Sequence, residues 1–222
     1  MTKLLQINYN IRAINTIMEQ KPLKYKSLDG ISEKQLSEHH DVLYAGYVNK
    51  YNEINESLTS VDLKAANGTY SELRELTIEK GFALNGVKLH EYYFDGMGGQ
   101  GGQPNGPIAE LIVRDFGSIE AWNDQFKALG MSARGWVVLA YNYDLQKLDN
   151  YICDVHNQGG IWNTSTILVM DVYEHSYFID YGVKRVDYID KYMANIDWDE
   201  VNNRVRNNIP GYQQNTDNKQ GE

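Results

Sequence analysis

The 222-residue sequence contains no apolar run that approaches the roughly 20 residues a helix needs to cross a bilayer. It has a single cysteine, Cys153, which excludes an internal disulfide framework and fits a reducing cytosol. Basic residues are outnumbered, with 21 Lys and Arg against 30 Asp and Glu, and the formal net charge of -9 argues against a nucleic-acid partner. The N-terminus has neither the apolar core nor the cleavage site of an export signal. We therefore expect a cytoplasmic globular protein with no membrane partner.

Two long segments in the first half carry the pattern of helices. Residues 31–55 begin with a capping box made by Ser32 and Gln35. Inward-facing residues then recur at the spacing of one helix face. They are Leu36, His39, Leu43, Tyr47 and Tyr51. A second helix is predicted over about 70–95, where Gly86 stands one turn before His90. Because glycine costs up to about 1 kcal/mol inside a helix, we expect a closely packed neighbour at Gly86.

Three other segments define the predicted domain limits. Residues 1–22 place apolar side chains on one helix face, which predicts an extra N-terminal helix. Residues 96–107 are too rich in Gly and Pro for a helix or strand and mark a linker between domains. These glycines lack the preceding strand and the following Lys-Ser/Thr pair of a phosphate loop, so we expect no phosphate site there. The polar tail, 210–222, is predicted to be disordered.

The second half predicts a small sheet. Helical patterns continue to about residue 132, and strand-like runs follow at 136–141, 148–153 and 167–171. The predicted fold class is therefore α+β. An N-terminal antiparallel helical hairpin, residues 23–95, is followed by a C-terminal domain, residues 108–209, in which helices surround a small three-stranded antiparallel sheet.

A carboxylate and an imidazole lie four residues apart directly after the last predicted strand, in the string Asp171-Val172-Tyr173-Glu174-His175-Ser176-Tyr177. Such a pair can hold one metal ion. The string resembles the signature of the iron/manganese superoxide dismutases, whose members carry Asp-x-Trp-Glu-His-Ala-Tyr here with Asp and His as metal ligands. In this chain Tyr173 replaces the Trp of that signature and Ser176 replaces the Ala.

Further motifs of the same family follow one another in the family's order between about residues 23 and 205. His39 lies in a helix that begins Ile-Ser and ends Tyr-Val-x-x-x-Asn, and His90 precedes an aromatic cluster. A Gly-Trp dipeptide, Gly135-Trp136, opens the first strand as in the family. The resemblance implies one iron or manganese ion per subunit. Its implied ligands are His39, His90, Asp171 and His175.

The resemblance also implies roles for residues around the metal. Tyr47, eight residues after His39, matches the tyrosine at the substrate gate, and Arg185 matches an arginine near the entrance. Trp136 would line the site, although a Trp at a strand start is equally typical of core packing. His40 is interpreted as a neighbour of the site and not as a ligand.

One departure from the family concerns the residue that contacts the metal-bound solvent. Most members use a Gln, which reaches the solvent from one of two places. Gly86 occupies the first place, so no amide can come from there. His156 stands at the second place, fifteen residues before Asp171, and Gln158 is the alternative if the alignment slips by two. An imidazole N–H donated to the solvent would favour the trivalent metal, but the choice between iron and manganese stays open.

A second departure concerns the subunit interface. Many members join a His, four residues after the first ligand, to a Tyr, three residues after the last ligand, across the interface. Leu43 and Phe178 stand at these positions. Since replacing both partners of a buried hydrogen bond by apolar groups can be nearly neutral, we expect an apolar contact in a homodimer or higher oligomer. Glu174 is expected to reach His175 of the partner subunit.

The implied activity is disproportionation of superoxide to dioxygen and hydrogen peroxide. Two alternatives remain at this stage. A catalytically weak or silent metal-binding homologue would agree with the altered surroundings of the metal. A metal-dependent hydrolase would need a general base beside the ligands, for which Glu174 is the one neighbouring carboxylate in the sequence.

Overall fold

The structure, a computed structural model, describes residues 17–212. Residues 1–16 of the predicted N-terminal helix and residues 213–222 of the predicted tail lie outside this range. Residues 17–22, the described part of the predicted N-terminal helix, are not helical. They run along the first helix instead, where the Met18 backbone exchanges hydrogen bonds of 2.9 and 2.8 Å with the Asn52 side chain.

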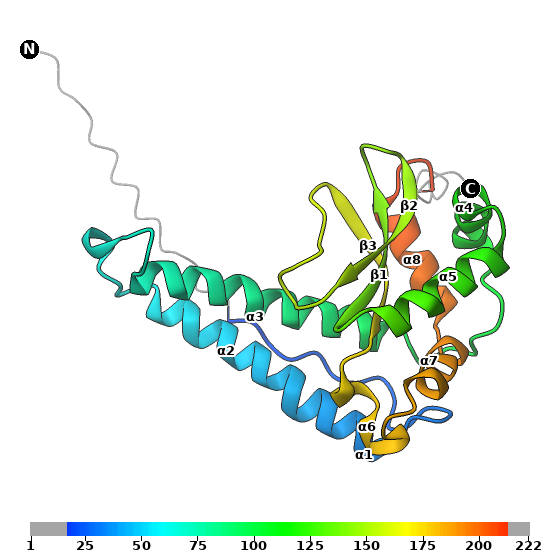
Figure 1. The fold of residues 1–222 in the computed structure, drawn as a ribbon, viewed down its shortest axis with the longest axis horizontal. Helices are drawn as coiled ribbons and strands as arrows, with labels where there is room; N and C mark the ends of the chain where they lie inside the picture. Colours follow the sequence, from blue (N-terminus) through cyan, green and yellow to red (C-terminus); the bar gives the residue numbers. More distant parts are fainter. Residues whose placement is uncertain (1–16, 213–222) are drawn as a thin grey trace, which may run out of the picture.

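A long helical hairpin forms the N-terminal half (Figure 1). Its first arm consists of α1 (Glu33–Ser37), a π-helix η1 (Glu38–Tyr44) and α2 (Ala45–Ser57), and its second arm is α3 (Glu72–Asp95). The connection between them contains a short 3-10 turn, η2 (Leu63–Ala65). Only half of the predicted capping box forms. Ser32 Oγ accepts the Gln35 N–H at 3.1 Å, but the Gln35 side chain points elsewhere. The Ser32 N–H donates to Asp180 instead, at 2.7 Å.

Because η1 is a π-helix, the side chains that face the core from the first arm differ from those that the sequence predicted. A π-turn contains one residue more than an α-turn, so side chains after His39 are rotated relative to a regular helix. Tyr44, five residues after His39, is buried, whereas Leu43 is 37% exposed. Leu43 therefore does not face the core as the α-helical spacing predicted. Its exposure is compatible with a contact outside this chain.

The C-terminal half contains one antiparallel sheet with the strand order β2-β1-β3. The strands are β1 (Trp136–Asn142), β2 (Lys147–Cys153) and β3 (Thr164–Asp171). Trp136 pairs with Cys153 on one side and with Asp171 on the other. This register places the first residue of the central strand directly beside the carboxylate predicted to bind metal. The predicted α+β fold class is confirmed.

Helices surround the sheet and close the fold (Figure 1). They are α4 (Gly106–Phe116), α5 (Ile119–Ser132), α7 (Arg185–Ala194) and α8 (Trp198–Asn208). Between β3 and α7 the chain makes a 3-10 turn, η3 (Glu174–Ser176), and a short helix, α6 (Phe178–Tyr181). Contacts of α3 with β3 join the hairpin to the sheet.

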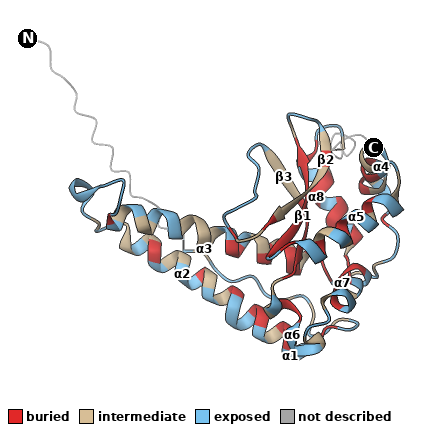
Figure 2. Ribbon diagram, viewed as in Figure 1, coloured by how far each residue is buried: buried red, intermediate tan, exposed pale blue. Residues whose placement is uncertain are grey.

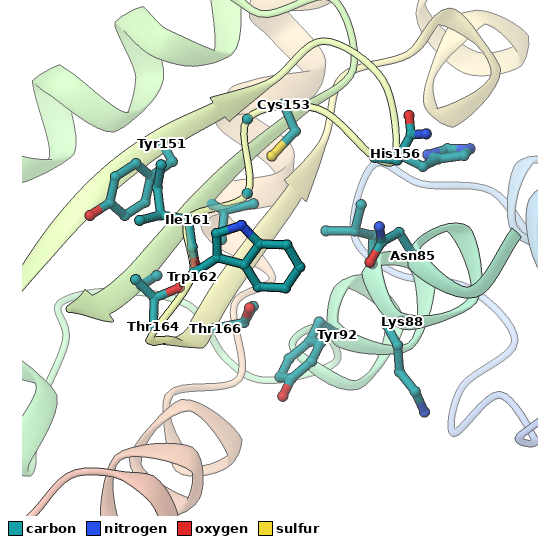
Figure 3. Close-up of a pocket in the computed structure, with 16 residues that line it drawn as sticks. Asn85, Lys88, Tyr92, Tyr151, Cys153, His156, Ile161, Trp162, Thr164 and Thr166 are labelled. Carbon is teal, nitrogen blue, oxygen red and sulfur yellow. Dashed lines mark hydrogen bonds between the residues drawn. The ribbon is translucent and has the colours of Figure 1, made fainter. Parts of the chain in front are cut away.

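Buried residues gather on the sheet, on the helices around it and on the end of α3 beneath it, while the far end of the hairpin is mostly exposed (Figure 2). A groove remains between α3, the sheet and the loop that joins β2 to β3 (Figure 3). Among the described residues, no helix combines the length and apolarity that crossing a membrane requires.

Candidate metal centre

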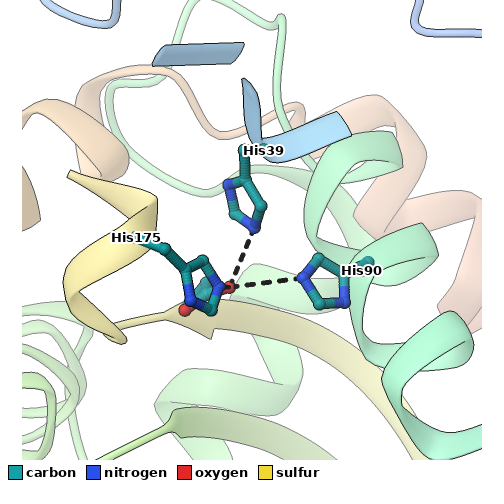
Figure 4. Close-up of side chains that lie close together, drawn as sticks. His39, His90 and His175 are labelled. Atoms are coloured by element: carbon teal, nitrogen blue, oxygen red, sulfur yellow. Dashed lines mark ion pairs between the residues drawn. The ribbon is translucent and has the colours of Figure 1, made fainter. Parts of the chain in front are cut away.

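Four side chains from four different elements converge between the hairpin and the sheet (Figure 4). His39 comes from η1 and His90 from α3, whereas Asp171 ends β3 and His175 lies in η3. One ligating atom from each residue lies within 4.8 Å of the other three. These are the four residues that the family resemblance implied as ligands, and we call them the histidine–aspartate cluster.

The atoms that face one another in this cluster have no other partner. Asp171 Oδ2 lies 3.1 Å from His39 Nε2, 3.3 Å from His175 Nε2 and 3.8 Å from His90 Nε2. All four atoms are buried, and none makes a hydrogen bond of acceptable geometry to the described residues. Because an unsatisfied buried polar atom costs about 1–3 kcal/mol, four at one point require an explanation. A cation at their centre would satisfy all of them.

Hydrogen bonds around the cluster direct its lone pairs inward. His90 Nδ1 lies 2.7 Å from the Gly86 carbonyl, which only accepts, so Nδ1 carries the proton and Nε2 presents a lone pair. Asp171 Oδ1 accepts the Tyr173 N–H at 2.9 Å, which leaves Oδ2 to face the three imidazoles. Partners of this kind fix the orientation and tautomer of metal ligands.

Burial keeps two of the imidazoles neutral. It lowers the pKa of His90 to about 3 and also lowers the pKa of His39. Burial alone would raise the pKa of Asp171, but His175 and His39 opposite the carboxyl hold that pKa well below its ordinary value. Burial opposes protonation of His175, yet the facing Asp171 carboxylate raises its pKa. Neutral imidazoles and an ionised carboxylate are the forms that bind a metal.

The loop that carries His175 is held by contacts that the sequence did not reveal. The Gln35 amide donates to the His175 carbonyl at 2.5 Å and accepts the Ile179 N–H at 3.1 Å. Ser176 Oγ bonds to the carbonyls of Asp171 and Tyr173 at 3.1 and 2.7 Å. The role of Gln35 was missed because the capping-box pattern already accounted for that residue, and no local signal indicates a partner 140 residues away.

Next to the cluster, three predicted site residues form one hydrogen-bonded chain. Trp136 Nε1 donates to His156 Nδ1 at 3.0 Å, and His156 Nε2 lies 2.7 Å from the Tyr47 hydroxyl. The Trp136 ring is fully buried, and its centroid lies 4.9 Å from the centroid of the His90 ring. Donation by His156 to metal-bound solvent stays a prediction, since its partners among the described residues are Trp136 and Tyr47. Gln158 is exposed.

Gly86 provides the space for Tyr47. A Cβ at Gly86 would lie 2.8 Å from Cδ1 of the Tyr47 ring. Tyr47 is therefore the closely packed neighbour that the sequence predicted for this helical glycine. The missing side chain lets the Tyr47 ring lie against α3 and within reach of His156.

The remaining predicted site residues lie further out. Glu174 is exposed, and Phe178 is 49% exposed. Arg185 Nε donates to the Tyr177 hydroxyl at 3.1 Å, and its guanidinium also donates to the Ala133 carbonyl at 2.8 Å. These contacts tie α7 to Tyr177, which follows the metal-binding motif, and to the end of α5. The structure describes one chain and therefore does not test the interface contacts predicted for Glu174 and Phe178.

The donor set fits one group of metals. Three nitrogen ligands and one carboxylate oxygen, with no thiolate, suit iron or manganese and leave coordination positions open for a small ligand. Asp171 is the one carboxylate of the cluster and is itself a candidate ligand, so the cluster offers no second carboxylate as the general base of a hydrolase. The arrangement therefore favours redox chemistry at a single ion.

Comparison with known proteins gives consistent matches. Residues 104–204 match the family model of the iron/manganese superoxide dismutases, C-terminal domain. A protein of Aquifex aeolicus named superoxide dismutase (Fe) is 37% identical over 204 residues, which cover 90% of this chain and 96% of that protein. A protein of the same name from Aquifex pyrophilus is 39% identical over 196 residues, or 86% of this chain and 92% of that protein. Superoxide dismutase (Mn) 2 of Haloferax volcanii is 37% identical over 185 residues, or 82% of this chain and 92% of that protein.

Proposed function

Since the chain belongs to the iron/manganese superoxide dismutase family, we propose that it disproportionates superoxide to dioxygen and hydrogen peroxide with one iron or manganese ion per subunit. The histidine–aspartate cluster would hold the ion. The observation that carries this proposal is the convergence of four buried, otherwise unpartnered ligand atoms within 4.8 Å of one another. The bound ion would supply one-electron chemistry by alternating between its trivalent and divalent states.

Reduction of superoxide to hydrogen peroxide consumes protons, and Tyr47 is placed to hold one. The indole N–H of Trp136 can only donate, so His156 Nδ1 must accept and carries no proton. The neutral His156 ring then has its proton on Nε2 and donates it to the Tyr47 oxygen. The Tyr47 hydroxyl proton is therefore free to point to a third group.

The protonation states agree with this direction of donation. Burial lowers the pKa of His156 to about 4, so the ring is neutral near pH 7. Burial also raises the pKa of Tyr47, so the phenol keeps its proton. Trp136 and His156 thus orient Tyr47 as a proton donor beside the cluster.

Superoxide is an anion, and the average charge of this chain, -9, repels it. A pocket of about 450 Å³ between α2 and α3 reaches Tyr47 and is lined by Lys50 and Phe82. Lys50 forms an exposed ion pair with Glu53 at 2.5 Å, which solvent weakens. The lining also contains one carboxylate, Glu79. We assign this pocket as the entrance, where Lys50 balances the negative charge of the lining.

The exposed positions of Leu43, Glu174 and Phe178 support the proposed homodimer. Leu43 and Phe178 are apolar yet 37% and 49% exposed, and an apolar contact with a second subunit would bury both. Glu174 of one subunit would contact His175 of the partner subunit, whose side chain is 29% exposed.

A single cysteine and no internal disulfide support the proposal that the enzyme works in the cytoplasm.

The experiment that tests this function measures metal content together with superoxide-dependent activity on separately iron-loaded and manganese-loaded protein. We expect one ion per subunit and catalytic turnover with at least one of the two metals. Stoichiometric metal without turnover in either form would instead identify a silent metal-binding homologue.

A further inference from the structure

An exposed tryptophan stands on the loop between β2 and β3. The side chain of Trp162 is 95% exposed, and that of neighbouring Ile161 is 48% exposed. The other three tryptophans are each at most 5% exposed. Tryptophan buries more apolar surface than most side chains, so leaving it in water forgoes a large gain.

Hydrogen bonds hold the loop around Trp162 in place. Thr164 Oγ1 donates to the Ile161 carbonyl at 2.7 Å, and the Asn163 amide donates to Asp144 at 2.7 Å. The Asn163 carbonyl accepts the Tyr143 N–H at 3.2 Å. These bonds fix the segments on both sides of Trp162. The exposed indole is therefore presented by an ordered loop.

The groove shown in Figure 3 lies directly beside this indole, between α3 and the sheet, and has a volume of about 460 Å³. Tyr92 and Leu89 of α3 form one wall, and Val138 and Tyr151 of the sheet contribute to the other. Aromatic and aliphatic surfaces of this kind favour an apolar occupant. Trp162 stands at the rim of its own groove and does not fill it.

The charges around the groove favour a second copy of this chain as the occupant. Two chains with a net charge of -9 repel each other on average, so copies associate best through faces without carboxylates. The groove lining contains no Asp or Glu, and its one Lys, Lys88, is already paired with Glu91 at 3.0 Å. The groove lining therefore has no unpaired lysine for an anionic ligand and no carboxylate for a basic partner.

We infer that Trp162 of one subunit inserts into the groove of a second subunit, and that the second subunit returns the same contact. A knob and a groove on one face are self-complementary about a two-fold axis, which is the requirement for a closed symmetric pair. Tryptophan is also one of the residue types enriched among the side chains that dominate the binding energy of protein interfaces. This contact uses the β2–β3 loop and α3, whereas the proposed Leu43 and Phe178 contact uses η1 and α6. The two contacts together build a four-subunit assembly.

Sedimentation of the full-length, metal-loaded protein tests the contact. Trp162→Ala should halve the mass of the assembly at a fixed protein concentration. Tyr70→Ala is the matched control, because Tyr70 is also an exposed aromatic residue, at 72%, but lies on the hairpin connection. Asn85→Arg places a bulky charge on the exposed α3 wall of the groove and should halve the mass as well.

Cys153 reports occupancy of the groove independently of mass. It lines the groove and is the only cysteine, so its reaction with a small thiol reagent measures access. The reaction should be faster in Trp162→Ala than in the wild type and unchanged in Tyr70→Ala.

Wild-type mass and thiol reactivity in both Trp162→Ala and Asn85→Arg would overturn the contact. A halved mass with unchanged Cys153 reactivity would overturn the groove as the place where Trp162 binds. Loss of the Leu43 contact alone would give dimers in place of tetramers. Trp162→Ala would still halve the mass of that remaining assembly.

Discussion

Replacing Gly86 by alanine tests whether the missing side chain positions Tyr47. The new Cβ would lie 2.8, 3.0 and 3.2 Å from three carbons of the Tyr47 ring, closer than carbon atoms pack. Inserting a methyl group into a filled contact costs about 1–3 kcal/mol. Replacing glycine by alanine inside a helix contributes about 0.5–1 kcal/mol in the opposite direction. The net effect is a loss of about 0–2.5 kcal/mol of folding free energy.

The same helix provides the matched control. A Cβ at Gly81 has no atom within 4 Å, so Gly81→Ala should gain about 0.5–1 kcal/mol through helix propensity alone. Urea unfolding of the wild type and both variants measures the two changes. Gly86→Ala should also lower activity while it keeps its metal, because the displaced Tyr47 ring loses its 2.7 Å contact with His156. Equal stabilisation by Gly81→Ala and Gly86→Ala, with full activity in both, would refute the packing role of Gly86.

Three other changes should have distinct outcomes. His156→Ala should keep the metal, lower activity and shift the reduction potential, because Tyr47 loses the imidazole that orients its hydroxyl; an unchanged potential would show that the metal does not depend on this hydrogen-bonded chain. Leu43→His should weaken the dimer, and adding Phe178→Tyr should partly restore it; a double variant no better than the single one would show that the two side chains do not meet. For the metal-free protein, the free energy of unfolding should fall as the pH drops from about 6.5 to about 4, because burial lowers the pKa of three histidines while only that of His175 is raised. A value that is constant or rises over this interval in urea titrations would contradict the buried, neutral state of these imidazoles.

The sequence predicted the elements whose signals are local. The capping Ser32 and the three strands each depend on neighbouring residues, and the structure contains both. The four residues of the histidine–aspartate cluster were found by resemblance to family motifs. The structure then brings them together from segments up to 136 residues apart, from His39 to His175.

What the sequence did not predict depends on packing between distant segments. The π-helix at Glu38–Tyr44 exchanges the roles of Leu43 and Tyr44, and no periodicity in the sequence indicates one extra residue in a turn. The Gln35 side chain serves the His175 loop and not its own helix start. The connection of His156 to Tyr47 joins residues 109 positions apart, so a motif could place each residue in the site but could not show that they touch.

Metal stoichiometry in His90→Ala tests the central claim most directly. His90 is fully buried, and its Nε2 atom has no hydrogen-bond partner among the described residues. Replacing His90 by alanine therefore removes a proposed ligand atom that makes no other hydrogen bond. His40→Gln is the matched control, because His40 is also a buried histidine but lies outside the cluster. Elemental analysis should find about one iron or manganese per subunit in the wild type and in His40→Gln, and almost none in His90→Ala. Stoichiometric metal in purified, folded His90→Ala would contradict the assignment of the histidine–aspartate cluster as the metal site.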